Sequence, residues 1–202
     1  MKFTEYLSKL QKISTTLDKN VTNAGVQGAV VFLFVRDYLL LIQRSEQMNS
    51  HKGQLAFIGG HVDAGDTDVM ATAKREFTEE THRKTDDIQF LGRLPAVKTM
   101  RSKDIVPILA YLDTEPTTFI DEIKSNGEWD EAILVNYQYL MDQDFWTHGK
   151  AYSKRDDYSI LFRTLSVNKI ITSAHNQRDF YVLWGATARM IWNFHHKFWS
   201  KL

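Results

Sequence analysis

The sequence predicts an α/β fold, because helical and extended patterns alternate along its 202 residues. Apolar residues recur at helical spacing near both ends of the chain, whereas β-branched and aromatic residues cluster in short runs between them. A chain of this length can enclose one substantial core. We therefore predict a single domain over residues 1–202, with an N-terminal helix at 1–20, a core at 25–140 and a C-terminal helix at 183–201.

Each element is predicted from its own pattern. Apolar side chains from Phe3 to Leu17 recur at helical spacing, which is typical of an amphipathic helix. Residues 27–35 and 38–43 predict a hairpin, and Arg36 and Asp37 form its turn. Further strands are predicted at 88–97, at 105–112, at 158–163 within the poorly patterned stretch 143–181, and at 128–137, where the strand leads into a short helix.

The balance of charge limits the partners of the protein. Lys plus Arg equals Asp plus Glu at 25 each, and the isoelectric point is near 7.1, so we expect no nucleic acid and no membrane among its partners. The chain contains no cysteine, which excludes disulfides and thiolate chemistry. It also shows no signal-peptide pattern and no apolar run near the ~20 residues that span a bilayer. We therefore expect a cytoplasmic protein.

The C-terminal helix leaves the oligomeric state open. Four apolar residues at helical spacing form its predicted buried stripe: Trp184, Ala188, Ile191 and Phe198. Trp192 and Trp199 lie outside that stripe. A homodimer contact or a membrane contact would use them, although an aromatic core is the interpretation that we favour.

The most informative stretch runs from Gly59 to His82. On a helix, Glu76, Glu79 and Glu80 share one face, where like charges repel each other by roughly 0.2–0.5 kcal/mol per pair. Mg²⁺ or Mn²⁺, which prefer oxygen ligands, would compensate these charges and are the predicted cofactor. The alternative is an acidic helix face that is merely solvated.

The residues before this helix support a built site. Gly59 and Gly60 permit close approaches of the backbone, as a loop that hands a ligand to a helix requires. Asp66 or Thr67 is predicted as the N-cap, and Asp68 suits the positive first turn. Val69, Ala73 and Phe77 recur at helical spacing and form the predicted buried face.

This stretch resembles the Nudix box, which runs Gly, five residues, Glu, seven residues, then Arg-Glu-apolar-any-Glu-Glu-any-Gly. Residues 75–80 match it one by one, whereas the first half is one residue longer, Asp66 or Thr67 replaces the early Glu, and His82 replaces the closing Gly. The resemblance implies an α/β/α sandwich with a mixed central sheet. It also implies metal-dependent hydrolysis of a nucleoside diphosphate linked to another moiety X, a small-molecule substrate. Glu76, Glu79 and Glu80 would hold the metal, Glu79 or Glu80 would be the general base, and Arg75 would hold the loop.

Residues 40–60 resemble more narrowly the coenzyme A pyrophosphatase branch of this family. Leu40-Leu41, Arg44-Ser45, Gly53, Phe57 and Gly59-Gly60 match its pattern, whereas Ile42, Asn49 and Ile58 depart from it. The resemblance implies hydrolysis of coenzyme A or an acyl-CoA to 3′,5′-ADP and 4′-phosphopantetheine. The substrate would then be contacted by Arg44, Gly53, Phe57, Gly59 and Gly60.

Two alternatives remain open at this point. Asn49 removes a guanidinium that would bind phosphate, which favours nucleotide sugars, ADP-ribose or dinucleotides as substrates instead. A non-catalytic Nudix-fold binding module is the second alternative, although the complete run at residues 75–80 favours an enzyme.

Two acids beyond the box are further candidates. Some Nudix enzymes take a metal ligand or a base from this part of the chain, and Glu128 and Glu131 lie at the start of a predicted strand. We predict Glu131 as catalytic, the alternative being acids that are solvated.

Overall fold

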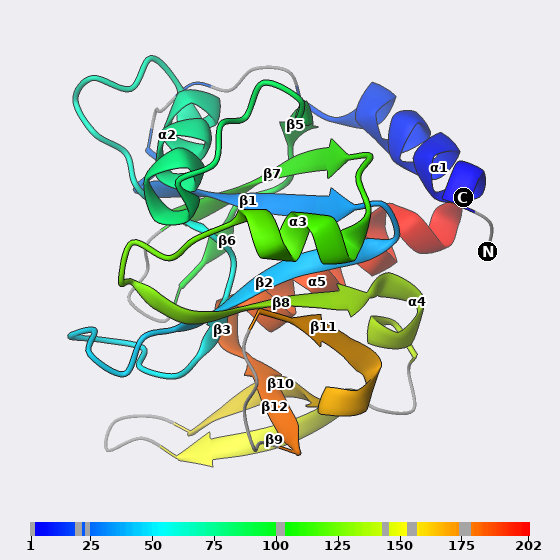
Figure 1. Cartoon of the computed structure of the whole chain (residues 1–202). Coiled ribbons are helices and arrows are strands. Elements are labelled where there is room, and N and C mark those ends of the chain that lie inside the picture. The colour runs from blue at the N-terminus through cyan, green and yellow to red at the C-terminus, as the bar shows by residue number, and fades with distance from the viewer. Residues whose placement is uncertain are drawn as a thin grey trace.

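The computed structural model describes residues 3–18, 22, 25–99, 104–142, 146–152, 157–173 and 179–202. Helices cover both faces of a central sheet, and a smaller sheet lies beside it (Figure 1). The predicted α/β/α sandwich is confirmed.

The central sheet is mixed and is organised around β1 (Gly28–Val35). This strand runs antiparallel to β2 (Tyr38–Arg44) and parallel to β7 (Asp104–Leu112), and it also pairs with β4 (Gly59–His61). The predicted hairpin is therefore confirmed. The other strands of this sheet are β3 (Leu55–Ala56), β5 (Gln89–Arg93), β6 (Val97–Lys98), β8 (Trp129–Asn136) and β11 (Ile170–Thr172).

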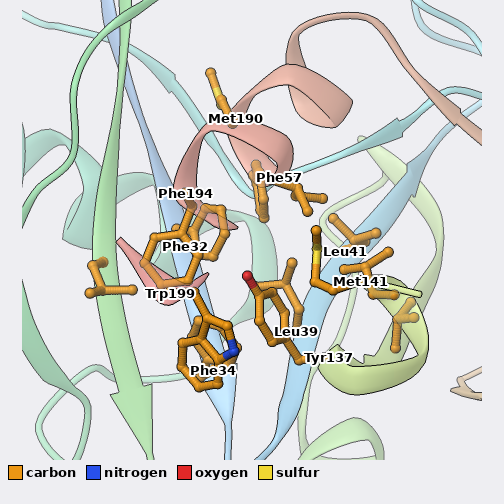
Figure 2. Packing of buried hydrophobic residues seen from close by; sticks show 14 of the residues in the cluster. Phe32, Phe34, Leu39, Leu41, Phe57, Tyr137, Met141, Met190, Phe194 and Trp199 are labelled. Carbon is orange, nitrogen blue, oxygen red and sulfur yellow. The ribbon is translucent and has the colours of Figure 1, made fainter. Parts of the chain in front are cut away.

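The two faces of the sheet carry separate hydrophobic clusters. Alternate residues of a strand point to opposite faces, so Val31 and Leu33 of β1 pack under α2 (Val69–Thr81) and α3 (Pro116–Glu122). Phe32 and Phe34 pack on the other face, where Figure 2 shows them beside Tyr137, Phe194 and Trp199. That face is covered by α1 (Phe3–Thr16), α4 (Tyr137–Leu140) and α5 (Gly185–Lys197).

Trp199 belongs to this second cluster. It lies in a short 3₁₀ helix, Trp199–Lys201, is 5 % exposed and stacks against Phe34 at a centroid distance of 6.1 Å. The aromatic core that the sequence favours is thus observed for Trp199.

Several boundaries differ from the prediction. The N-terminal helix ends at Thr16 rather than at residue 20. The predicted strand at 88–97 is two strands, β5 and β6. Between them Leu94 donates its amide hydrogen to the carbonyl of Pro107 in β7, which has no N–H to return the bond. The C-terminal helix begins at Gly185 rather than at residue 183, because Leu183 and Trp184 belong to a strand.

That strand is part of a three-stranded sheet of which the sequence indicated only one strand. It contains β9 (Trp146–Tyr152), β10 (Asp157–Ser166) and β12 (Phe180–Trp184), with β10 in the middle. A 3₁₀ turn, Val167–Lys169, connects β10 to β11 of the central sheet. Among the described residues, no helix is both long enough and apolar enough to cross a bilayer.

Candidate active site

The acidic helix α2 is capped by Asp68, whose carboxylate accepts a hydrogen bond from the amide of Ala71 at 2.8 Å. The prediction of Asp66 or Thr67 as the N-cap is therefore wrong by one or two residues. Asp66 instead ties the loop before the helix to the helix itself. Its carboxylate accepts hydrogen bonds from the amide of Asp63 at 2.9 Å and the hydroxyl of Thr72 at 2.8 Å, and it pairs with Arg75.

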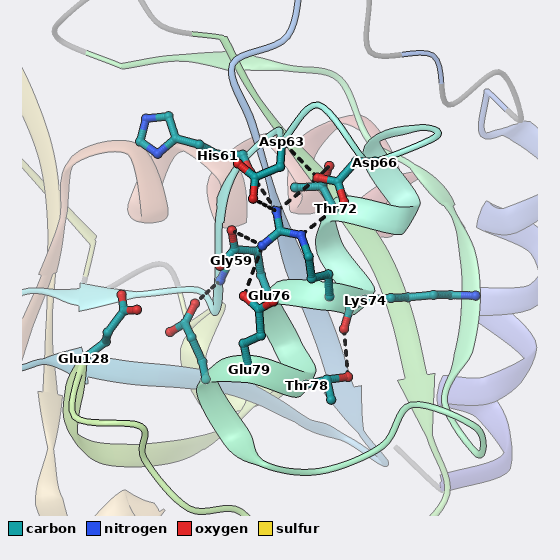
Figure 3. A network of polar contacts seen from close by, with 12 residues as sticks. Gly59, His61, Asp63, Asp66, Thr72, Lys74, Glu76, Thr78, Glu79 and Glu128 are labelled. Carbon is teal, nitrogen blue, oxygen red and sulfur yellow. Dashed lines mark hydrogen bonds and ion pairs between the residues drawn. The ribbon is translucent and has the colours of Figure 1, made fainter.

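Arg75 is the centre of a network that holds the loop on the helix (Figure 3). Its guanidinium donates to both carboxylate oxygens of Asp66 at 3.1 and 3.0 Å, and to the carbonyl of His61 at 3.0 Å. The Nη1 atom also contacts Glu76 at 3.0 Å and Glu79 at 3.1 Å. The hydrogen bond from Arg75, followed by those from the amide of Asp63 and the hydroxyl of Thr72, holds the pKa of the Asp66 carboxyl well below its usual range. Arg75 thus joins the loop to the acidic face.

The glycine pair lets the loop lie against the acidic helix. Gly59 has a φ of 146°, and a Cβ built there would stand 2.3 Å from the carbonyl oxygen of Ala29. A Cβ on Gly60 would stand 2.3 to 2.7 Å from the carboxylate atoms of Glu76. The absence of both side chains allows the amide of Gly59 to donate to Glu80 at 2.9 Å.

Glu80 is the most buried of the three glutamates. It is 1 % exposed, its Oε1 accepts from Gly59, and its Oε2 has no hydrogen-bond partner. Burial, with the charges of Glu128 and Glu76 as weaker causes, raises the pKa of the Glu80 carboxyl to about 8. Burial also raises the pKa of Glu76. Both carboxyls therefore sit where a cation would stabilise their charged form.

The three glutamates fit a divalent cation in composition, and two of them, Glu76 and Glu80, are also largely buried. In the parts of the chain that the structure describes, no three carboxylate or imidazole groups converge tightly enough to hold an ion as they stand. Arg75 engages Glu76 and Glu79, and Glu79 is 54 % exposed. The buried Oε2 of Glu80 and the Glu76 carboxylate, which lies against the backbone of Gly60, are the features that suit a ligand set of hard oxygens.

The predicted substrate residues fall into two groups. Arg44 ends β2 and is close enough to Glu80 for its charge to lower the pKa of that carboxyl, against the effect of burial. Its Nε is buried with no hydrogen-bond partner. Gly53, with a φ of 64°, donates its amide hydrogen to the carbonyl of Arg44 at 3.0 Å. Phe57, in contrast, is 4 % exposed and packs on Phe32 within the core.

Glu131 lies away from the three glutamates. Ala132 packs in the cluster under α2 and Ile133 in the opposite cluster, so strand alternation puts Glu131 on the face away from α2. There the hydroxyls of Thr172 and Tyr181 donate to its Oε1, that of Tyr181 at 2.6 Å. The structure thus separates Glu131 from the acidic site, contrary to the catalytic role predicted for it.

Glu128 is the acid that joins the site instead. Its charge raises the pKa of both Glu76 and Glu80, and Figure 3 shows it beside the acidic face. A β-bulge between Gln43 and Arg44 shifts the register of β8 at this point. Periodicity alone could not locate that bulge, so the sequence favoured Glu131 over Glu128.

The acidic helix ends in a left-handed residue although the usual glycine is missing. His82 has φ 54° and ψ 20°, and its amide donates to the carbonyl of Thr78 at 2.9 Å. Histidine is among the residues that tolerate this conformation better than most. The replacement of the family's glycine by His82 therefore leaves the usual left-handed helix end in place.

Comparisons with known proteins identify the family. The NUDIX domain model matches residues 26–168. Nudix hydrolase NudL of Escherichia coli O6:H1, which is named as uncharacterized, is 34 % identical over 192 residues, or 93 % of this chain and 90 % of the relative. The relative of that name in E. coli O7:K1 is 28 % identical over the same shares.

Among solved structures, a Caenorhabditis elegans Ap4A hydrolase in a binary complex matches with a TM-score of 0.47 and 18 % identity, over 57 % of this chain and 83 % of that chain. The family assignment depends on the domain model and on the relative at 34 % identity, which both extend over most of the chain. The protein belongs to the Nudix hydrolase family and is an enzyme that hydrolyses the diphosphate linkage of nucleoside diphosphate-X substrates.

Proposed function

We propose that this Nudix hydrolase cleaves coenzyme A or an acyl-CoA to 3′,5′-ADP and 4′-phosphopantetheine. The observation that carries the proposal is the contact between two motifs. Residues 40–60 resemble the coenzyme A pyrophosphatase pattern, and Gly59 of this segment donates its amide hydrogen to Glu80 in the Nudix box at 2.9 Å. The charge of Arg44 also lowers the pKa of the Glu80 carboxyl. The segment therefore adjoins the acidic site, where substrate contacts are needed.

We propose that some residues of the site contribute charge, as metal ligands or as partners of the diphosphate, and that the glycines contribute close packing. Nudix hydrolases in general depend on divalent metals, and we propose Mg²⁺ or Mn²⁺ held by Glu76, Glu79 and Glu80. When bound, such an ion neutralises diphosphate oxygens and lowers the pKa of a coordinated water. Arg75 keeps the loop in place through Asp66, and Arg44 offers a positive charge to the diphosphate. Gly53, Gly59 and Gly60 let the backbone pack closely against Glu46, Ala29 and Glu76, which shapes the approach to the acidic site.

The proton from the attacking water needs an acceptor in the same place. Glu79 is exposed and lies beside Arg75, whereas Glu80 is buried with one oxygen free of hydrogen bonds. We propose that one of these two carboxylates is the general base. Glu128, which faces the same site, is a further acid for which we propose a supporting role.

A substrate panel tests the proposal. The purified enzyme is assayed with Mg²⁺ or Mn²⁺ on coenzyme A, an acyl-CoA, a nucleotide sugar, ADP-ribose and a dinucleoside polyphosphate, and the kcat/KM values are compared. We expect coenzyme A or the acyl-CoA to have the highest value. A clear preference for a nucleotide sugar or ADP-ribose would refute the coenzyme A proposal, although the family activity would stand.

A matched pair of substitutions tests the role of the glutamates. Glu79→Gln should lower turnover by about 10²-fold or more, because it removes a charge from the metal site. Glu122→Gln is the control, since Glu122 is also an exposed partner of an arginine, Arg83, at 3.2 Å but lies outside the acidic site. Equal turnover of the two variants would remove Glu79 from the metal site.

A further inference from the structure

A groove lies between the loop after β2 and the strand β12, outside the acidic site. Its volume is about 380 Å³, which is within the range of small-molecule sites. One wall is formed by Lys52, Gly53, Gln54 and Leu55, and the other by residues of β12. In Figure 1, β12 lies below β3 in the view, with the loop of residues 45–54 extending to the left.

The wall formed by β12 is an exposed apolar strip. Phe180 and Val182 are 56 % and 43 % exposed, and Trp184 is half-buried. These three residues alternate with Tyr181 and Leu183, which are buried, so their side chains share the outer face of the strand. Phe180 and Val182 are large hydrophobic side chains that the fold leaves in contact with water inside a groove, which is typical of a ligand site.

Both walls are held by hydrogen bonds from buried side chains. The hydroxyl of Tyr181 donates to Glu131 at 2.6 Å, which fastens β12 to β8. The side-chain amide of Gln43, which is 4 % exposed, donates to the carbonyl of Gly53 at 3.1 Å and fixes the loop. Glu131, which lies away from the acidic site, thus supports the groove.

The groove adjoins the active site through one residue. The amide of Gly53 donates to the carbonyl of Arg44, and the amide of Arg44 donates to the carbonyl of Gln54, each at 3.0 Å. The Arg44 side chain acts electrostatically on Glu80. Gln43 lines the groove from the face of the sheet away from α2, and Arg44 is the next residue of β2, so the groove and the acidic site meet around the end of this strand. A substrate with its diphosphate at Arg44 reaches the groove around that end.

We propose that this groove binds the nucleobase of the nucleoside diphosphate substrate, with Phe180 and Trp184 providing aromatic faces and Gln54 and Lys52 facing the polar edge of the base. A base has a flat apolar face and a hydrogen-bonding edge, which matches a groove with one aromatic and one polar wall. The nucleoside is also the part that every substrate of this family's reaction has in common. The inference rests on the hydrolase function but does not require coenzyme A as the substrate.

Substitution of Phe180 tests the proposal, because this exposed side chain is dispensable for the core. Phe180→Ala should raise the KM for coenzyme A and the Kd for 3′,5′-ADP about tenfold and leave kcat unchanged, since loss of one stacking contact typically weakens binding by about this factor. The Kd is measured by calorimetry without metal. Binding of 4′-phosphopantetheine should not change. Phe180→Tyr should restore binding, whereas Phe180→Leu, which keeps apolar area without an aromatic ring, should not.

Leu202→Ala is the matched control, because Leu202 is 51 % exposed and does not line the groove. Unchanged binding of 3′,5′-ADP to Phe180→Ala would overturn the proposal, and so would weaker binding of 4′-phosphopantetheine alone. If the wild-type enzyme prefers ADP-ribose, the coenzyme A proposal fails. The groove is then tested with ADP-ribose and AMP, and a tenfold rise in KM and Kd supports it.

Discussion

Glu80 carries a proton at a pH where most glutamates are charged. Its carboxyl is 1 % exposed and has a pKa of about 8 in the folded protein, against an ordinary value of 4.5. Between these values the folded protein binds a proton that the unfolded chain does not, so stability falls as pH rises, by up to about 1.4 kcal/mol per pH unit. We expect the Tm of the metal-free enzyme to fall from pH 5 to pH 8, and Glu80→Gln to flatten that fall.

Calorimetry or circular dichroism across this pH range checks the slope. Glu79→Gln is the control, because Glu79 lies on the same helix but is 54 % exposed, and this variant should keep the wild-type slope. An unchanged slope in Glu80→Gln would show that another group titrates.

The two adjacent glycines differ in what surrounds them, and alanine substitutions should separate stability from activity. At Gly59 a Cβ would meet backbone, at 2.3 Å from Ala29 and 2.6 Å from Val30, so Gly59→Ala should destabilise the protein by about 2 kcal/mol or more. At Gly60 the Cβ would meet the movable carboxylate of Glu76. Gly60→Ala should therefore lower kcat and leave Tm close to that of the wild type.

Gly65→Ala is the control for both, because no atom lies within 4 Å of the Cβ built there and Gly65 is in the same loop. Tm and kcat/KM of the three variants are measured together. Equal loss of stability in Gly59→Ala and Gly60→Ala would contradict this account of the glycine pair.

At the scale of elements, the loop before α2 depends on Arg75. Asp66 accepts from the amide of Asp63 and pairs with Arg75, so the guanidinium ties the loop to the helix. Arg75→Gln should cost about 1.5–3 kcal/mol, because it removes charged hydrogen bonds from a carboxylate that is 6 % exposed. Hydrogen exchange of residues 61–68 should accelerate, and kcat should fall.

Arg83→Gln is the matched control for this prediction. Arg83 also pairs with two acids, Asp87 and Glu122, at 2.7 and 3.2 Å, but lies beyond the end of α2. This variant should leave exchange in residues 61–68 and kcat unchanged. Unchanged exchange in Arg75→Gln would show that the loop is held by other contacts.

Local patterns predicted the elements whose cause is local. The hairpin of β1 and β2 follows from two runs of β-branched and aromatic residues, and the buried face of α2 at Val69, Ala73 and Phe77 follows from helical periodicity; the structure shows both. The prediction of the N-cap was wrong because the carboxylate of Asp66 pairs with Arg75, nine residues along the chain, and not with the first amides of the helix. The small sheet was mostly missed because its strands are stabilised by pairing with each other, as Phe162 is with Trp184 and with Thr147. Such contacts leave no short-range pattern.

At the scale of the whole molecule, the central sheet divides the acids into two sets. Glu76, Glu80 and Glu128 interact electrostatically on the side of α2, whereas Glu131 contacts Tyr181 on the side of the small sheet. The sequence placed Glu128 and Glu131 together because they are three residues apart. The bulge in β2 and β8 and the alternation of the strand determine which one faces the active site.

This division predicts opposite results for two conservative substitutions. Glu128→Gln should lower kcat with little change in Tm, because its half-buried carboxylate contributes charge beside Glu76 and Glu80. Glu131→Gln should lower the free energy of unfolding by about 1–3 kcal/mol, and with it the Tm. A neutral amide is a weaker buried acceptor for the hydroxyls of Tyr181 and Thr172 than a carboxylate is. The kcat of this variant should stay near that of the wild type, while its KM rises as the groove between β12 and the loop loosens. A large loss of kcat in Glu131→Gln, at unchanged KM and Tm, would instead support the catalytic role that the sequence predicted for Glu131.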